Sequence, residues 1–173
     1  LSALSTIVSG NTMTVRTGAV VVSINASPAA QNIVAGVTNV LLGQYNFDAT
    51  QSGEDVRFTA LKFYYDEVTT MAIDPTNCFV WDGATRLSDT AVNPDADGDD
   101  TYTLDTTLTV PKGTVKVLSI RCDIPGSAST GTFAFDLNFS TTAITTFTGV
   151  GTGSGQTITP TTPSAAITDG QTM

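Results

Sequence analysis

The feature that most constrains the fold is an alternation of apolar and polar side chains in residues 131–140, GTFAFDLNFS. The large apolar side chains share one parity: Phe133, Phe135, Leu137 and Phe139. The positions between them are Thr132, Ala134, Asp136 and Asn138. Successive side chains of a strand point to opposite faces, so this period of two predicts a strand with one buried face and one wet face.

Other segments have the composition or the alternation of strands. They are residues 12–24, 39–49, 101–110 and 115–124. Residues 78–89 predict a hairpin, because Asp82-Gly83 is a pair that tight turns favour. For residues 66–72 we expect a helical turn.

Residues 55–66 change face partway along the segment. The apolar positions are Val56, Phe58, Leu61, Phe63 and Tyr65. Their parity changes after Phe58, which one extra residue would explain. We therefore predict a β-bulge near Thr59–Ala60.

The number and spacing of these segments predict an all-β fold. About eight to ten short strands separated by turn clusters are typical of an antiparallel two-sheet β-sandwich, immunoglobulin-like or jelly-roll. We expect one sandwich domain over residues 12–147, after an amino-terminal extension of residues 1–11. Residues 148–173 form a Gly/Thr/Pro-rich tail whose first part is linker-like and whose end is strand-like.

Charge and composition exclude several function classes. The formal net charge of −9 opposes binding to nucleic acid and to anionic lipid surfaces. No apolar run approaches the roughly 18 residues of a membrane span, so we expect no membrane insertion. The absence of histidine removes Ser-His-Asp catalysis and His-ligated metal sites. The carboxylates at Asp66, Glu67, Asp82 and Asp89 are best interpreted as solvated turn residues, so we expect no enzyme and no required cofactor.

The two cysteines lie in apolar, strand-like runs. Cys122 has the parity of Leu118, Ile120 and Ile124, so its side chain should point inward. We expect a disulfide between Cys78 and Cys122, with two buried free thiols as the alternative. A disulfide would indicate an oxidising, extracellular or cell-surface setting.

Residues 93–100, NPDADGDD, are rich in oxygen ligands. Asn93, Asp95, Asp97 and Asp99 alternate along the chain, and Gly98 is present as in the opening of a calcium loop. The twelfth position is Leu104, where such a loop has a bidentate Glu. Two interpretations stay open: a calcium site, or an acidic hairpin loop without metal.

A group of aromatic residues could form a platform that stacks on surface glycans: Tyr45, Tyr64, Tyr65 and Trp81. Packing in the core or at its rim is the better-supported interpretation of these residues.

The last ten residues resemble residues 4–13. The identities are Ile7/Ile167, Gly10/Gly170, Thr12/Thr172 and Met13/Met173. Chance, a tandem array with a period of one domain, and a shared affinity for one kind of groove all explain this similarity. An open sandwich edge accepts added strands. The amino-terminal segment is the more apolar candidate donor, through Leu1, Leu4, Ile7 and Val8.

Several longer stretches resemble β-sandwich modules of secreted bacterial and archaeal surface proteins. They are residues 10–50, 54–63, 81–89 and 107–124, and the resemblance covers about residues 10–140. It implies a structural role in surface layers, adhesins or extracellular filaments, often stabilised by calcium or strand exchange; the paired cysteines depart from this pattern. We expect a subunit of a pilus-like fibre that polymerises with itself, head to tail, by donor-strand complementation. The alternative is an adhesin or carbohydrate-binding module in a tandem array or surface layer.

Overall fold

The structure is a computed structural model, and it describes residues 10–69, 74–94, 98–137, 144 and 146–163. All regular elements in these residues are strands, so the prediction of an all-β fold is confirmed. They are β1 (Val21–Ile24), β2 (Val40–Asp48), β3 (Val56–Thr69), β4 (Thr76–Asp82), β5 (Thr85–Arg86), β6 (Gly98–Val110), β7 (Val115–Asp123), β8 (Thr132–Asp136), β9 (Gly149–Gly151) and β10 (Thr157–Ile158).

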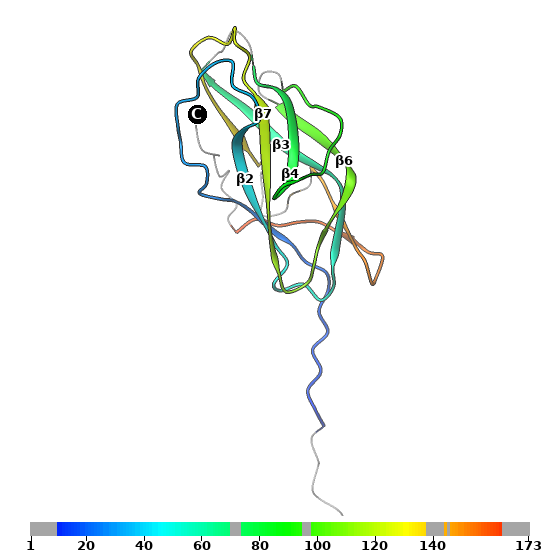
Figure 1. The fold of residues 1–173 in the computed structure, drawn as a ribbon. Coiled ribbons are helices and arrows are strands. Elements are labelled where there is room, and N and C mark those ends of the chain that lie inside the picture. Colours follow the sequence, from blue (N-terminus) through cyan, green and yellow to red (C-terminus); the bar gives the residue numbers. More distant parts are fainter. Residues whose placement is uncertain (1–9, 70–73, 95–97, 138–143, 145, 164–173) are drawn as a thin grey trace, which may run out of the picture.

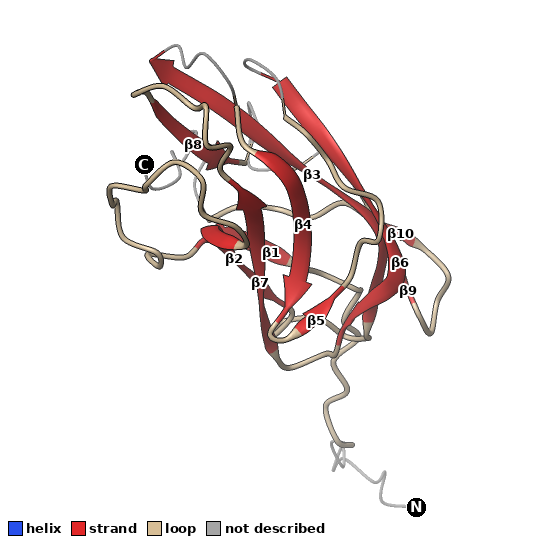
Figure 2. Ribbon diagram, turned by 45° about the horizontal axis from the view of Figure 1, so that its top comes forward, coloured by secondary structure: helices blue, strands red, loops and turns tan. Residues whose placement is uncertain are grey.

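The strands form two antiparallel sheets that pack face to face (Figures 1 and 2). One sheet has the order β1-β2-β7-β4-β5, and the other has the order β10-β9-β3-β6. Strand β8 pairs with the far half of β3, beyond the part that pairs with β9. The predicted two-sheet sandwich is therefore confirmed.

Aromatic side chains of β2 and β3 fill the space between the sheets. The rings of Tyr45 and Phe63 lie 4.4 Å apart, and those of Phe47 and Phe58 lie 5.6 Å apart. All four side chains are buried. Aromatic residues contribute most of the burial in such a core, so these cross-sheet contacts hold the two layers together.

The predicted change of face in β3 is confirmed. Phe58 pairs with Leu108 and Ala60 with Thr103, so β3 advances two residues while β6 advances five. The register shift lies at the predicted position, but the extra residues are on β6 rather than on β3. It allows both Phe58 and Leu61 to face the core, although they have opposite parity.

Strand β8 is buried more completely than its alternation predicted. Phe133, Phe135 and Leu137 are buried as expected, but Ala134 and Asp136 are only 1% and 3% exposed. The wet face predicted for this strand is therefore wrong at these two positions. The Tyr45 hydroxyl reaches β8 from the other sheet and donates a hydrogen bond to the Phe135 carbonyl (2.9 Å). Burial raises the pKa of Tyr45, and the nearby Tyr102 and Asp136 raise it further.

The glycine-rich segment after Phe147, interpreted as linker-like, instead contributes strands β9 and β10 to a sheet. Gly149 makes the close approach possible, because an added Cβ would lie 2.7 Å from Val56 Cγ1 and 2.8 Å from Phe58 Cε1. The helical turn expected at residues 66–72 is also wrong in its described part, since β3 continues to Thr69.

The predicted disulfide is present between Cys78 and Cys122, and both residues are fully buried. It joins β4 to β7, which are neighbours in the same sheet, with the two Cα atoms 4.1 Å apart. The hairpin predicted at Asp82-Gly83 is also confirmed, because Asp82 pairs with Thr85 across a two-residue turn. Gly83 has a φ of 60°, which glycine adopts without a steric penalty.

Candidate functional site

The amino-terminal segment Gly10–Thr17 leaves the sandwich as an extended chain (Figures 1 and 2). All of these residues are exposed, including two apolar ones: Met13 is 89% exposed and Val15 is 94% exposed. Only residues 21–24 of the strand predicted at 12–24 pair with another strand. The predicted donor residues Leu1, Leu4, Ile7 and Val8 lie outside the described residues.

The segment is held where it joins the body. The Gly53 N–H donates to the Thr17 carbonyl (2.9 Å), and the Ala19 N–H donates to Ser52 Oγ (3.1 Å). Both partners belong to the turn that follows β2. These two hydrogen bonds hold the start of the segment at one end of the sandwich, and Met13 and Val15 project from that end.

Glu54, in the same turn, fastens the β9–β10 hairpin beside this anchor. Its carboxylate accepts hydrogen bonds from the N–H groups of Gly153 (2.8 Å) and Ser154 (2.7 Å) and from Ser154 Oγ (2.6 Å). The Ser154 hydroxyl is the main cause of a lowered pKa for Glu54, and the two N–H groups lower it further. A cleft of about 430 Å³ lies between this hairpin and the root of the segment, lined by Arg16, Thr17 and Glu54 among others.

We predict that Glu54→Gln makes stability less dependent on pH in the acidic range. Because hydrogen bonds lower the pKa of Glu54 in the folded state, the charged carboxylate stabilises the fold above its unfolded pKa of about 4.3. That contribution disappears as the pH falls through the lowered pKa. Urea unfolding should therefore show wild type to be more stable than the variant at neutral pH, with the difference vanishing near pH 2. An equal difference at both pH values would contradict this role of the charge.

The residues after β10 run beside β1 in the same direction. Thr161 forms a parallel bridge with Val21. The Val22 N–H donates to the Thr161 carbonyl (2.7 Å), and the Thr161 N–H donates to the Val20 carbonyl (3.0 Å). The chain's own residues therefore occupy the outer edge of β1 at this point. The last described residues head away from the end where the amino-terminal segment leaves.

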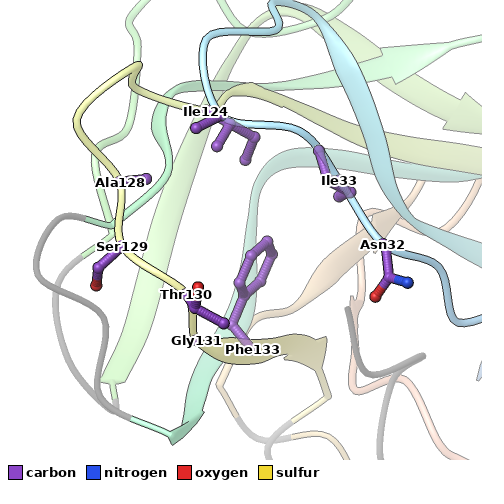
Figure 3. Close-up of a pocket in the computed structure, with 9 residues that line it drawn as sticks. Asn32, Ile33, Ile124, Ala128, Ser129, Thr130, Gly131 and Phe133 are labelled. Atoms are coloured by element: carbon purple, nitrogen blue, oxygen red, sulfur yellow. The ribbon is translucent and has the colours of Figure 1, made fainter.

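A groove with both apolar and polar lining residues lies at the opposite end of the sandwich from that segment. It has a volume of about 220 Å³ and lies between the β1–β2 loop and the β7–β8 loop. Figure 3 shows Ile124 and Phe133 pointing into the space between these loops, with Ile33 beside them. Ala35 and Ala128 add to the apolar lining, whereas Asn32, Ser129 and Thr130 make part of it polar.

Backbone hydrogen bonds fix the two loops against each other. The Gly36 N–H donates to the Ile124 carbonyl, and the Ile124 N–H donates to the Val37 carbonyl, both at 2.9 Å. Gly36 has a φ of 88°, so a side chain there would strain the loop. This groove was not predicted from the sequence; its local signal is Ile33 in a loop of mainly small and polar residues.

The structure does not bring the candidate calcium ligands together in a described site. Asn93 Oδ1 accepts a hydrogen bond from the Asn77 N–H (2.8 Å), and Asp99 lies in β6 opposite Tyr64. Asp95 and Asp97 lie outside the described residues. Among the residues that are described, no three His, Cys, Asp or Glu side chains form a metal-binding group. Calcium binding by this loop stays a prediction.

Two members of the proposed aromatic platform are buried. Tyr45 and Tyr65 are both 0% exposed, so neither can stack on a sugar at the surface. Trp81 and Tyr64 are partly buried, and the Arg121 guanidinium lies over the Trp81 ring at 5.8 Å. Packing in the core therefore explains Tyr45 and Tyr65.

Asp82 and Asp89, two of the carboxylates interpreted as solvated turn residues, each form an ion pair with a basic side chain. Asp82 forms an ion pair with Lys116, and Asp89 forms one with Arg86 (3.0 Å).

In the described part of the chain, no helix is long and apolar enough to cross a membrane. Comparison of the chain with protein families, with curated proteins and with solved structures found no match.

Proposed function

We propose that this chain is a structural subunit of an extracellular assembly in which copies join head to tail through the amino-terminal segment. The observation that carries the proposal is the exposure of Met13 and Val15 on an extended segment anchored at one end of a sandwich. Because the side chains of Met13 and Val15 are exposed in their own chain, they are available to a second copy. The chain's own Thr161 already pairs at the outer edge of β1, so a donated segment would dock elsewhere.

The energetics of such a contact depend on its apolar side chains. Burying one apolar side chain of this size contributes about 1.5–3 kcal/mol, and each backbone hydrogen bond adds about 0.5–1.5 kcal/mol. Ordering an extended segment costs about 1–2 kcal/mol per residue, so the apolar contacts must supply most of the net gain. A head-to-tail contact of this kind is heterologous and produces an open filament unless the rotation closes a ring.

An extracellular setting is part of the proposal. The buried Cys78–Cys122 disulfide supports it, because disulfides persist in oxidising compartments. The net charge of −9 suits a protein exposed to the medium and makes nucleic acid an unsuitable partner.

The central test uses two double variants of the amino-terminal segment. We predict that Met13→Asp with Val15→Asp raises the concentration needed for polymerisation by more than about tenfold, because both side chains lose apolar burial. The matched control is Thr12→Asp with Thr14→Asp, which adds the same charge at exposed positions of the other parity. Light scattering and negative-stain microscopy measure polymers. Equal polymerisation of the two double variants would contradict the proposal.

The second candidate function is a surface module within an array, acting as an adhesin or carbohydrate-binding unit. The observation that favours it is the direction of residues 159–163 along β1, which carries the chain toward the end opposite its entry. A chain with this geometry can link modules in series. This candidate would be favoured if the unaltered protein and the Met13→Asp, Val15→Asp double variant both stay monomeric and both bind glycans.

A further inference from the structure

We propose that the groove between the β1–β2 and β7–β8 loops receives the amino-terminal segment of a second copy, with Val15 in contact with Ile124 and Phe133. This inference rests on the proposed head-to-tail assembly and names its acceptor site.

The first argument is that the groove and the segment lie at opposite ends of the same strand. Val40, the first residue of β2, pairs with Cys122, two residues before the groove residue Ile124. The last residue of β2 is Asp48, and the turn after it contains Gly53, which anchors Thr17. The nine residues of β2 span about 27 Å, so about that distance separates the two sites.

The second argument is that the segment cannot reach its own groove. Val15 is two residues from Thr17, and two residues of extended chain span at most about 7 Å. While Thr17 stays anchored, a contact between Val15 and the groove must therefore join two copies. Repetition of that contact from copy to copy produces a head-to-tail chain unless the rotation closes a ring.

The third argument is the fit between the two surfaces. A cavity of about 150 Å³ lined by apolar side chains holds a benzene-sized molecule, so a groove of about 220 Å³ has room for an apolar side chain such as valine or methionine. The polar lining at Asn32, Ser129 and Thr130 suits the backbone and the threonines that flank Met13 and Val15.

The unpaired edge of strand β6 is less suitable as an acceptor than the groove. Strand β6 pairs with β3 alone among the described strands, so it forms the edge of its sheet. Its sequence places Asp99, Asp100 and Asp105 along that edge, and charged side chains on edge strands oppose the addition of another strand. The groove carries no acidic side chain among its described lining residues.

Disulfide trapping tests the inference, because both native cysteines are already paired. One chain carries Val15→Cys, and an isotopically labelled chain carries Ala35→Cys, so a mixed dimer has its own mass. A disulfide requires the two Cα atoms to come within about 7 Å. The matched control replaces Ala35→Cys by Gln31→Cys, which is exposed on the same loop but does not line the groove.

We expect at least about tenfold more mixed dimer with Ala35→Cys than with Gln31→Cys, since docking brings the thiols to a millimolar effective concentration. Light scattering on the unaltered protein reports polymerisation separately, because Val15→Cys itself removes apolar surface at the proposed contact. Polymers without selective trapping at Ala35 would overturn the groove assignment and leave the proposed function intact. Absence of polymers at every concentration would overturn both.

A companion variant tests whether the groove is occupied by the chain's own tail or by the amino-terminal segment of a second copy. Ala35→Cys combined with Ile167→Cys in one chain would form an intramolecular disulfide if the tail occupied the groove. That result, seen as a monomer with altered mobility on a non-reducing gel, would overturn the inference. Trapping through Val15 with no such monomer supports it.

Discussion

Replacing both disulfide cysteines, Cys78→Ala with Cys122→Ala, is expected to lower the free energy of unfolding by about 2–4 kcal/mol. The bridge closes a loop between residues 44 positions apart, and closing it restricts the unfolded chain more than the folded one. Both residues are fully buried, one in β4 and the other in β7, so the substitution also removes core contacts. Urea unfolding followed by tryptophan fluorescence measures the change.

Reduction of the unaltered protein is the matched control for this experiment, because it opens the bridge while leaving both sulfur atoms in place. The reduced wild type should lose most of the same free energy. If the reduced and oxidised proteins unfold at the same urea concentration, the bridge does not contribute to stability as we infer.

Phe58→Ala is expected to lower the free energy of unfolding by about 3–5 kcal/mol, the usual range for removal of a buried phenylalanine. The Phe58 ring lies 5.6 Å from that of Phe47 on the opposite sheet and 6.0 Å from that of Phe147. The substitution therefore leaves a cavity where both sheets and the segment before β9 meet.

Thr59→Ala is the control for Phe58→Ala, since Thr59 is the next residue of β3 and is exposed. It should change the free energy of unfolding by no more than about 0.5 kcal/mol, as most surface substitutions do. A loss below about 1 kcal/mol for Phe58→Ala would show that this ring is not packed as the structure describes.

Local patterns were sufficient to predict much of the sandwich. The parity change after Phe58, the Asp82-Gly83 turn and the inward side of Cys122 each depend on residues close together in sequence. The structure confirms each of them. They were predictable because a strand with one buried face shows that face in the alternation of its own residues. The disulfide followed from two cysteines expected to be buried in strands.

Partners from distant parts of the chain explain what local patterns missed. The segment containing Met13 and Val15 alternates as a strand does, but a strand exists only where another strand pairs with it. Strands β9 and β10 form from a sequence that looked like a linker, because Gly149 can lie against Val56 and Phe58. Asp136 is buried because β8 is covered on both sides, and alternation cannot show whether the polar side is covered as well.

The candidate site was less predictable than the fold. The sequence identified an apolar amino-terminal segment, but the groove requires two loops far apart in sequence to meet. Ile33 and Phe133 acquire a common role only when the β1–β2 loop bonds to Ile124 through Gly36 and Val37. The position of this groove at the far end of β2 from Thr17 follows from the strand order and could not be derived from composition.

The parallel alignment of Thr161 with Val21 has a mechanical consequence. Tension drawn through Thr17 and Pro163 would pull these neighbouring segments past each other along their length. The two hydrogen bonds between them would then carry the load together in shear, instead of opening one after the other as in peeling. A module loaded in this way resists extension better than one whose terminal strands are unzipped from an edge.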